Sequence, residues 1–353
     1  MFEPKYKITE KIVNDLSKIS EIKGIVERAT LIPAREAFLR KVAVIKMAHT
    51  STSIEGNVLN EAQVGAVVEG KKVTAQPDQV REVINYLSAL KQIDRLTESG
   101  NKFDIKDILA VHKTVTNGLV DKEKSGVFRP GEVYIVNIEP GGKEEVAYTP
   151  PPSKSVYKLI EELLEWLDTQ INVHPVIRAG LFHYQFVTIH PFTDGNGRVA
   201  RLLTTLHLYQ SGWDYRRALV LEDYYNRDRK SYYENLQTAE TYKKRENIDL
   251  TSWLEYYVGG FYEEAEKLRE QILVLSAVGG NDLTPQVLDK DELKIVDFVT
   301  TVGRLTSQDA VDILEVPKRT AQDKLKKLVE KGVLVKKGKG PSTDYIIASK
   351  DNN

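Results

Sequence analysis

The stretch HPFTDGNGR at residues 190–198 gathers side chains that together can act on a phosphorylated substrate. His190 has an ordinary pKa near neutrality, so its imidazole can take a proton from a hydroxyl group and return it. Asp194 supplies a single carboxylate, which suits Mg²⁺ because this ion takes its other ligands from water and substrate phosphates. The stretch therefore predicts a general base beside a magnesium ligand.

The glycines and arginines of the same stretch predict a polyphosphate site. Gly195 and Gly197 lack a Cβ atom, so backbone N–H groups here can approach an anion closely. The apolar periodicity of VARLLTTLHLY, which begins at Val199, indicates a helix, and a helix N-terminus favours negative charge. Arg198 and Arg201 lie three residues apart, on one face of the first turn, where each guanidinium can bind phosphate oxygens.

Each of these residues taken alone has a simpler interpretation. TDG is compatible with a surface turn, His190 with a buried structural histidine, and the two arginines with solvated side chains. Two cations at a helix N-terminus, however, oppose the helix dipole unless an anion lies between them. We therefore expect the group as a whole to bind phosphate.

The motif HPFTDGNGRVAR resembles the signature of the Fic proteins, HPF-x-(D/E)-GNGR-x-x-R, at every defined position. The resemblance implies a mostly helical core with a β-hairpin flap, and transfer of AMP from ATP to a protein hydroxyl with Mg²⁺. Both glycines are present, which favours nucleotidyl transfer over the phosphorylation of the Doc-type branch. The implied roles are His190 as catalytic base, Asp194 as Mg²⁺ ligand, Gly195, Asn196 and Gly197 as anion hole, Arg198 at the β-phosphate and Arg201 at the γ-phosphate.

A second motif, STSIEGN at 51–57, follows an apolar helical stripe. Residues 33–48 indicate a helix, with a proline in the first turn and apolar residues along one face. Continuing this period places Ser51 and Glu55 on the same buried face, with Gly56 as the stop. The weak helix propensity of TSTS leaves a break near His49 as an alternative.

A carboxylate on a buried face requires a cation. The pattern SxxxEG alone is weak and is also compatible with an exposed helix end. Beside the first motif it resembles the inhibitory motif of Fic proteins, which implies that Glu55 pairs with Arg201 and closes the γ-phosphate site. Ser51, Glu55 and Gly56 would then form an inhibitory segment within the same chain.

Residues 126–152 alternate apolar and polar residues on both sides of EPGGKEE and end in a triple proline, which predicts a β-hairpin. In Fic proteins a flap of this kind holds the target segment. The resemblance therefore makes Val146, Ala147, Tyr148 and Thr149 candidate docking residues, although a plain edge hairpin explains the pattern equally well.

The segment YYENL at 232–236 resembles the tyrosine pair that Fic proteins place near the adenine. The resemblance implies that Tyr232 and Tyr233 contact the nucleotide, although core packing gives the same pattern. His183 lies seven residues before His190 on a helical run, and we expect it to be structural.

Length and composition limit the number of domains and the class of protein that the chain can form. With 353 residues, 41% of them hydrophobic, and a net charge of −1, the chain is long enough for two or three domains. It has no cysteine, which excludes disulfides and thiol catalysis. Neither a signal peptide nor an apolar run of about eighteen residues is apparent, so we expect a soluble, cytoplasmic protein without a membrane segment.

The segment SAVGGNDLTPQ at 276–286 interrupts a long helical stretch and predicts a domain boundary. Helices are expected at 293–302, at 306–314 with Thr306 or Ser307 as N-cap, and at 317–331, followed by strands at 333–335 and 345–347. This order resembles a winged helix-turn-helix, whose third helix would enter a DNA groove.

Residues 317–340 carry nine lysines and arginines against two acids, so this segment is +7 and the rest of the chain −8. Such segregation indicates contact with nucleic acid. A solvated helix face or a protein-docking role gives a similar pattern.

We therefore expect a mainly α protein with three regions: an N-terminal helical region at 1–100, a catalytic core at 101–275 and a winged helix-turn-helix at 287–348. The expected function is that of an autoinhibited protein adenylyltransferase, which moves AMP from ATP to a Ser, Thr or Tyr hydroxyl of a target protein or of the chain itself. The alternatives are a hydrolase that removes AMP from a modified protein, and a DNA-binding regulator that senses nucleotide. A homodimer is implied by the resemblance alone.

Overall fold

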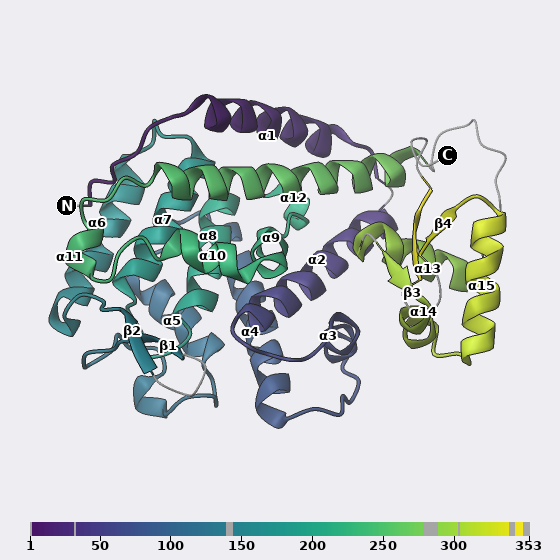
Figure 1. Ribbon diagram of the computed structural model, residues 1–353, viewed down its shortest axis with the longest axis horizontal. Helices are drawn as coiled ribbons and strands as arrows, with labels where there is room; N and C mark the ends of the chain where they lie inside the picture. The colour runs from purple at the N-terminus through teal and green to yellow at the C-terminus, as the bar shows by residue number, and fades with distance from the viewer. Residues whose placement is uncertain are drawn as a thin grey trace. The chain divides into compact units, whose positions relative to one another are not determined.

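The computed structural model of the chain describes residues 2–31, 33–138, 144–277, 289–302, 304–338 and 343–348. Helices dominate the described residues (Figure 1), so the expected mainly α fold class is confirmed. The chain divides into two compact units, residues 1–27 with 44–266 and residues 28–43 with 267–353. The division falls within α2 and α12 and at the last residue of α1, at residues that the sequence did not mark as a boundary.

The elements follow the chain in this order: α1 (Glu10–Arg28), α2 (Pro33–Ile54), α3 (Glu61–Val68), α4 (Pro77–Glu98), α5 (Ile105–Val115), η1 (Lys122–Lys124), β1 (Ile135–Ile138), β2 (Glu144–Tyr148), η2 (Ser153–Ser155), α6 (Val156–Thr169), α7 (Pro175–Ile189), α8 (Asn196–Gln210), η3 (Tyr215–Arg217), α9 (Leu221–Arg227), α10 (Arg229–Leu236), α11 (Tyr242–Arg245), α12 (Thr251–Ala277), α13 (Lys290–Val302), β3 (Leu305–Thr306), α14 (Ser307–Leu314), α15 (Lys318–Glu330), β4 (Leu334–Lys337) and β5 (Asp344–Ile347).

Helices α7 and α8 form the centre of the first unit. Both are buried around most of their circumference, as expected for helices without a wide polar face. Helices α4 and α5 pack against α8, while α6, α10 and α11 pack against α7. The loop that joins α7 to α8 carries the HPFTDG part of the first motif, so the motif lies between two buried helices.

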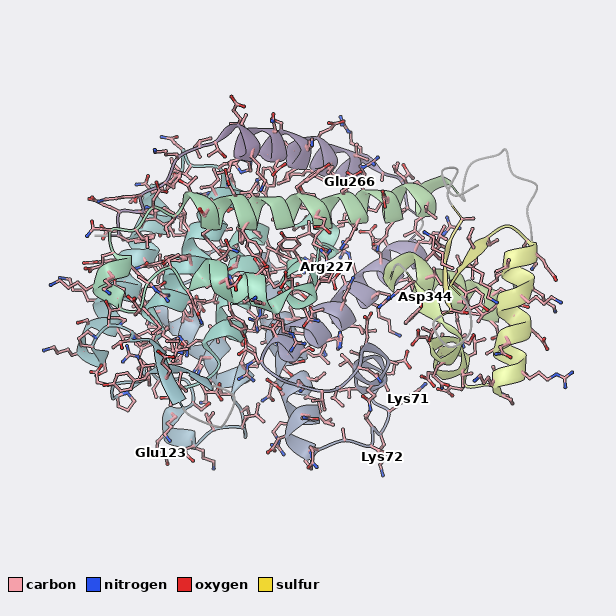
Figure 2. All side chains as sticks on the ribbon, viewed as in Figure 1. Lys71, Lys72, Glu123, Arg227, Glu266 and Asp344 are labelled. Atoms are coloured by element: carbon pink, nitrogen blue, oxygen red, sulfur yellow. The ribbon has the colours of Figure 1, made fainter. Side chains whose placement is uncertain are left out.

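Long-range polar contacts hold the first part of α12 in the first unit. Helix α1 lies alongside the first part of α12 (Figure 1), where the Thr9 hydroxyl donates to Glu255 at 2.7 Å. Arg227, at the end of α9 and labelled in Figure 2, makes ion pairs of 2.6 and 2.7 Å with Glu263 and Glu264 of α12. The first of these pairs is largely exposed and contributes little, whereas Glu264 is buried and its pair is screened less.

The predicted hairpin is present as the antiparallel pair β1 and β2, with Ile135 opposite Tyr148 and Ile138 opposite Glu144. The pairing shifts between Ile135 and Val136, which is a β-bulge. Residues 139–143 of the expected EPGGKEE turn lie outside the described residues.

Helix α2 runs without interruption from Pro33 to Ile54, so the break considered near His49 is wrong. The hydroxyls of Thr50 and Thr52 donate to the carbonyls of Lys46 and Ala48, each at 2.7 Å. Residues 50–54 are also buried. Packing therefore outweighs the weak helix propensity of TSTS, while the internal hydrogen bonds satisfy the buried threonine hydroxyls.

The second unit contains α13, α14 and α15 with an antiparallel sheet of order β3-β5-β4. Thr306 caps α14 in a capping box with Asp309, as its position in the sequence predicts. Strand β3 was not predicted because its two residues are too short to show a periodic pattern. The expected boundary at 276–286 falls largely on residues outside the described part of the chain. The winged-helix identity of this unit stays a prediction.

Within the described residues, every helix is too short or too polar to span a membrane.

Gly180 of α7 allows close packing of α12, and we predict that Gly180→Ala lowers the free energy of unfolding by about 1–3 kcal/mol. An added Cβ atom would lie 2.7 Å from the Tyr257 ring, and Trp253 Nε1 already donates to the Gly180 carbonyl at 2.8 Å. Gly65→Ala on α3 is the matched control, since its Cβ would make an ordinary 3.7 Å contact with Ile45. Urea denaturation measures both variants, and equal effects would contradict the close packing.

Candidate active site

The loop between α7 and α8 is held in one conformation by its own side chains. His190 ends α7 in the left-handed region at φ 50°, and Gly195 precedes α8 at φ 80°. The Asn196 side chain donates to the Phe192 carbonyl and accepts from the Phe192 N–H, both at 2.9 Å. Asn196, expected in the anion hole, therefore uses its side chain to close the loop.

His112 of α5 contacts the loop between α7 and α8. The sequence patterns did not predict it as a site residue. Its ring stacks on Phe192 at 3.7 Å between centroids. Nδ1 accepts from the Gly126 N–H at 2.9 Å, so the proton lies on Nε2, which donates to the Asp194 carbonyl at 3.1 Å. Burial lowers the pKa of His112 to about 4, although the Asp194 carbonyl acts in the opposite direction. The histidine is neutral at pH 7.

Arg129 joins the loop to both ends of the hairpin segment. Its Nε donates to the His190 carbonyl at 2.8 Å and its Nη1 to the Gly131 carbonyl at 3.0 Å, while Nη2 donates to the Pro151 carbonyl. Its backbone N–H also donates to the Pro191 carbonyl at 2.9 Å. The side chain of Arg129 is fully buried, so these hydrogen bonds hold the backbone at His190 and Pro191.

His190 itself is suited to accept a proton. Burial lowers its pKa to about 4, and the positive charge of Arg129 lowers it further, while the Val187 carbonyl and the carboxylates of Glu55 and Asp194 raise it. The imidazole is therefore neutral at pH 7, which is the form that a general base requires.

Arg201 meets the segment that the sequence marked as inhibitory. Its Nε donates to the Ser51 hydroxyl, and its Nη2 donates to the Ser51 carbonyl and to Glu55 Oε1, all at 2.8 Å. The side chain is only 1% exposed. Burial lowers the pKa of Arg201, but the Glu55 carboxylate together with the neighbouring Tyr232 and Tyr86 raises it by more, so the pKa lies above its ordinary value. Gly56 follows in the left-handed region and ends the segment.

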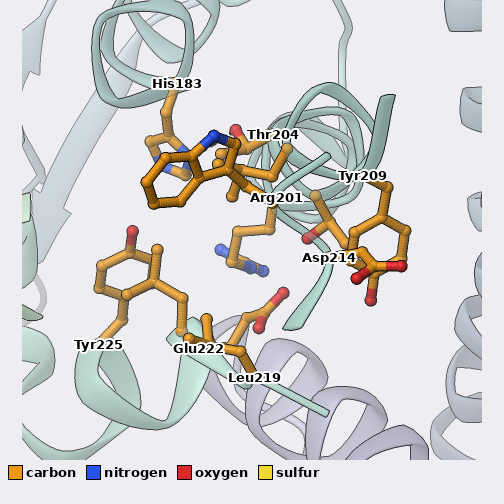
Figure 3. A pocket seen from close by; sticks show the side chains of 12 residues that line it. His183, Arg201, Thr204, Tyr209, Asp214, Leu219, Glu222 and Tyr225 are labelled. Atoms are coloured by element: carbon orange, nitrogen blue, oxygen red, sulfur yellow. Dashed lines mark hydrogen bonds between the residues drawn. The ribbon is translucent and has the colours of Figure 1, made fainter. Parts of the chain in front are cut away.

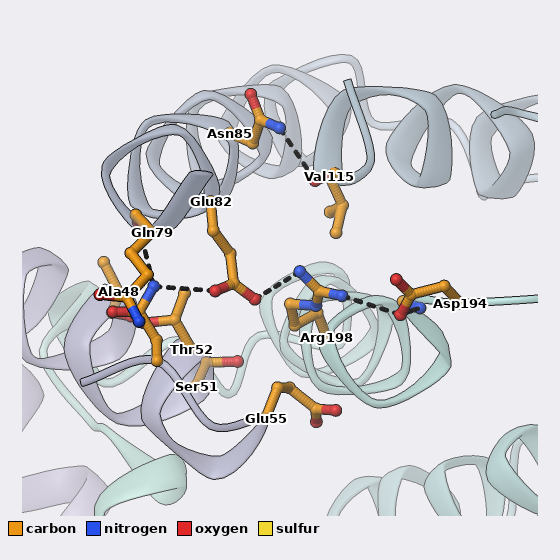
Figure 4. A network of polar contacts seen from close by, with 12 residues as sticks. Ala48, Ser51, Thr52, Glu55, Gln79, Glu82, Asn85, Val115, Asp194 and Arg198 are labelled. Atoms are coloured by element: carbon orange, nitrogen blue, oxygen red, sulfur yellow. Dashed lines mark hydrogen bonds and ion pairs between the residues drawn. The ribbon is translucent and has the colours of Figure 1, made fainter. Parts of the chain in front are cut away.

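Arg198 lies between two carboxylates (Figure 4). Its Nη1 donates to Glu82 of α4 at 2.5 Å and its Nη2 to Asp194 at 3.1 Å. Glu82 lies 116 residues away in sequence and was not predicted. No short-range pattern marks it, because only the packing of α4 against α8 brings it to the loop.

The arginines retain buried N–H groups for a further acceptor. Within the described part of the chain, Arg198 Nε and Arg201 Nη1 are buried and have no hydrogen-bond partner. Buried donors without an acceptor are costly, so a bound anion would satisfy them. A Cβ atom added at Gly197 would collide with Glu55 Oε1 and lie 3.0 Å from Arg201 Nη1. The Glu55 carboxylate thus lies over the glycine backbone, where the sequence predicts a phosphate.

Asp194 fits the expected magnesium ligand. Its side chain is 55% exposed, and Oδ1 accepts from the Gly195 N–H and from Arg198. Over the residues with described side chains, no cluster of three or more His, Asp or Glu could hold a metal. An ion at Asp194 would take its remaining ligands from phosphate and water, which agrees with the preference of Mg²⁺.

Arg201, Glu222 and Tyr225 are among the residues that line a small cavity (Figure 3). Its volume of about 20 Å³ has room for one water molecule, so it is too small for a nucleotide. Burial raises the pKa of Glu222, and the charge of Arg201 acts in the opposite direction.

The tyrosine pair divides between core and surface. Tyr232 is buried, stacks on Tyr225 at 4.5 Å and contacts His183 Nε2 through its hydroxyl at 2.9 Å. Tyr233 is partly exposed and donates to the Ile54 carbonyl at 3.4 Å. His183 is buried between Tyr232 and Thr204, which agrees with a structural role. Contact of Tyr232 and Tyr233 with nucleotide stays a prediction.

The candidate docking residues of β2 also differ in exposure. The Val146 side chain is 52% exposed, Ala147 is partly buried, and Tyr148 is buried with its hydroxyl on the Thr188 carbonyl at 2.7 Å. The Thr149 backbone already pairs with Glu240 and Tyr242. Val146 is therefore the residue whose side chain is most available to a target.

Comparison with known sequences shows which protein family the region around the loop resembles. Residues 102–208 match the model of the Fic/DOC family. The protein adenylyltransferase Fic of Aedes aegypti is 32% identical over 233 residues, which cover 64% of this chain and 40% of that protein. Its counterpart in Drosophila melanogaster is 33% identical over 206 residues, covering 56% and 37%. The chain thus spans about two fifths of the length of these curated relatives.

Solved structures show the same helical fold. A Fic family protein from Desulfovibrio desulfuricans matches over the whole of both chains, with a TM-score of 0.63 and 28% identity. A part of Fic-1 from C. elegans matches 76% of this chain and 74% of that chain, with a TM-score of 0.59 and 22% identity. The second likeness concerns the fold alone.

His112 should make the stability of the first unit depend on pH. The pKa of His112 is about 4 in the folded state and 6.5 in the unfolded chain. As the pH falls, the unfolded chain therefore binds the proton before the folded protein does. The contribution of neutral His112 is complete above pH 6.5 and is lost as the pH falls towards 4. We predict that His112→Asn reduces the slope of the unfolding free energy against pH by up to about 1.4 kcal/mol per pH unit in this window. Urea denaturation at a series of pH values measures this slope, and an unchanged slope would contradict the assignment.

Proposed function

Since residues 102–208 form a Fic domain, we propose that the chain is an autoinhibited protein adenylyltransferase. It would move AMP from ATP to a Ser, Thr or Tyr hydroxyl of a target protein and release pyrophosphate. The contact of Glu55 with Arg201 carries this proposal, because it places a carboxylate beside the buried N–H groups that a triphosphate would otherwise satisfy. The curated relatives named protein adenylyltransferase Fic support the same reaction.

The reaction can be written from the residues of the loop. The target hydroxyl oxygen forms a bond to the α-phosphorus, and its proton passes to neutral His190. The bond from the α-phosphorus to the bridging oxygen breaks, and the electron pair leaves with pyrophosphate. Arg198 and Arg201 would hold the β- and γ-phosphates, and the backbone of Gly195 and Gly197 the α-phosphate, at the N-terminus of α8.

ATP and Mg²⁺ are the proposed donor and ion. Magnesium bound by Asp194 and the phosphates would neutralise charge that develops on the leaving group. The half-exposed carboxylate of Asp194 and the two guanidinium nitrogens without an acceptor support this assignment. The names of the curated relatives support adenylyl transfer.

The proposed restraint is the segment Ser51, Glu55 and Gly56. Glu55 and the Ser51 carbonyl both accept from Arg201 Nη2, so the arginine cannot offer that nitrogen to a γ-phosphate while the contact persists. Like charges would also repel, since the Glu55 carboxylate lies near Gly197, where the phosphates are expected.

We predict that Glu55→Gly raises self-labelling from α-labelled ATP at least tenfold, because it frees Arg201 for the γ-phosphate. His190→Ala in the Glu55→Gly background should abolish the labelling. Autoradiography of both variants at equal concentration measures the effect. Labelling of the double variant at the level of the single variant would remove His190 from the role of base.

A hydrolase is the second candidate, because Glu55 lies close enough to the phosphate site to orient a water molecule. In that case the resting protein would release AMP from a protein labelled beforehand. Release of AMP by the parent chain that is lost in Glu55→Gln would favour the hydrolase. No release by either the parent chain or Glu55→Gln would favour the transferase.

We also propose that the second unit contacts DNA. Helix α15 exposes Arg319, Gln322 and Lys326 along one face, and β4 exposes Lys336 and Lys337. Lys324 and Lys331 are less available, since they pair with Asp289 and Glu292. Helix α15 with the β3-β5-β4 sheet supports the winged helix-turn-helix interpretation.

Arg319→Glu with Lys326→Glu should weaken duplex DNA binding at least tenfold in a gel shift at physiological salt, because two phosphate contacts become repulsive. Lys71→Glu with Lys72→Glu is the matched control, since these exposed lysines lie in the loop between α3 and α4 (Figure 2). No shift with the parent protein, or equal loss in both variants, would remove the DNA proposal. A homodimer and a cytoplasmic location stay predictions from the sequence.

A further inference from the structure

Glu82 is the carboxylate on Arg198 that neither motif contains. It lies on α4, is largely buried, and contacts Arg198 Nη1 through Oε1 at 2.5 Å (Figure 4). Its other oxygen, Oε2, accepts from Asn57 Nδ2 at 2.8 Å. Both oxygens of Glu82 are therefore engaged, and the carboxylate is fixed on two sides.

Asn57 connects this carboxylate to the inhibitory segment. Its Nδ2 also donates to the Gln79 carbonyl at 3.0 Å, and its Oδ1 accepts from the Leu59 N–H at 3.0 Å. The backbone N–H groups of Asn57 and Glu55 both donate to the Thr52 carbonyl at 3.1 Å. One turn of chain, residues 52–57, thus carries the acid that faces Arg201 and the amide that holds Glu82.

We propose that Glu82 is a positioning residue for Arg198 and that Asn57 holds Glu82 in place. By holding Nη1, Glu82 leaves Nη2 on Asp194, the proposed Mg²⁺ ligand, and leaves the buried Nε of Arg198 to donate to a phosphate oxygen. The turn at 52–57 then has two opposite effects: Glu55 blocks Arg201, and Asn57 supports Arg198. Relief of inhibition therefore requires displacement of the Glu55 side chain while the turn itself stays in place.

The geometry favours a role for Glu82 in supporting Arg198 over a role in competing with phosphate. A carboxylate that competes with phosphate must leave when the nucleotide binds, as Glu55 would. Glu82 is instead bound by Asn57 and by Arg198 at once, and it contacts the guanidinium at Nη1, whereas Asp194 contacts Nη2. An Arg198 without Glu82 would keep Asp194 as its one carboxylate partner, and its guanidinium could turn towards it.

The test rests on the proposed function, because it uses nucleotide binding in the Glu55→Gly background. Calorimetric titrations with AMP and with ADP separate the α-phosphate site from the β-phosphate site that Arg198 would serve. We expect Glu55→Gly to bind ADP more tightly than AMP. Adding Glu82→Ala should lower ADP affinity about tenfold and leave AMP affinity unchanged.

Three further variants make the comparison specific. Glu82→Gln keeps a carbonyl oxygen for Arg198 and should retain most of the ADP preference. Asn57→Ala removes the donor to Glu82 without changing any charge, so it should lower ADP affinity in the same direction by a smaller factor. Asp78→Ala removes an exposed carboxylate one turn earlier on α4 and should change neither affinity. Melting temperatures show whether each variant folds. If Glu82→Ala does not fold, the affinities of Asn57→Ala and Glu82→Gln test the positioning role of Glu82.

The outcomes separate the possible failures. Equal loss of AMP and ADP affinity would make Glu82 a structural residue, and a rise in ADP affinity would make it a second competitor; either result overturns the positioning role, as does no change. If the Glu55→Gly parent binds neither nucleotide, the proposed function itself fails and the role of Glu82 fails with it.

Discussion

The burial of Arg201 is the constraint on which the rest of the site depends. A guanidinium with 1% exposure must receive acceptors from the protein or from a ligand, because it cannot give up its charge. In this structure Ser51 and Glu55 supply acceptors, and among the described residues none accepts from Nη1. The same buried charge that pairs with Glu55 is suited to a triphosphate, so the proposed inhibition and the proposed catalysis would use one electrostatic site.

The loop between α7 and α8 can present these groups because buried polar side chains fix it from several elements. His112 holds the Asp194 carbonyl, Arg129 holds the His190 carbonyl, and Asn196 closes the turn at Phe192. Networks of this kind are costly when partly broken, and this gives the loop a single conformation. A preorganised loop needs little rearrangement when the substrate arrives, which is the usual source of electrostatic catalysis.

The sequence predicts the groups that lie close together in the chain and misses those that the fold brings in from afar. The first motif, the end of α2, the hairpin and the cap at Thr306 all follow from short-range patterns, and the structure contains each of them. Glu82, His112 and Arg129 come from separate elements, and no local spacing relates them to the loop. The unbroken helix through TSTS likewise depends on burial, which a propensity scale does not include.

The most direct test of this account compares ATP and AMP binding by the parent chain and by Glu55→Gly in calorimetric titrations with Mg²⁺. If Glu55 closes the γ-phosphate site at Arg201, its removal should raise ATP affinity about tenfold or more and leave AMP affinity nearly unchanged. Equal gains for both nucleotides, or no binding of ATP by the variant, would contradict the central role of the Glu55 and Arg201 pair.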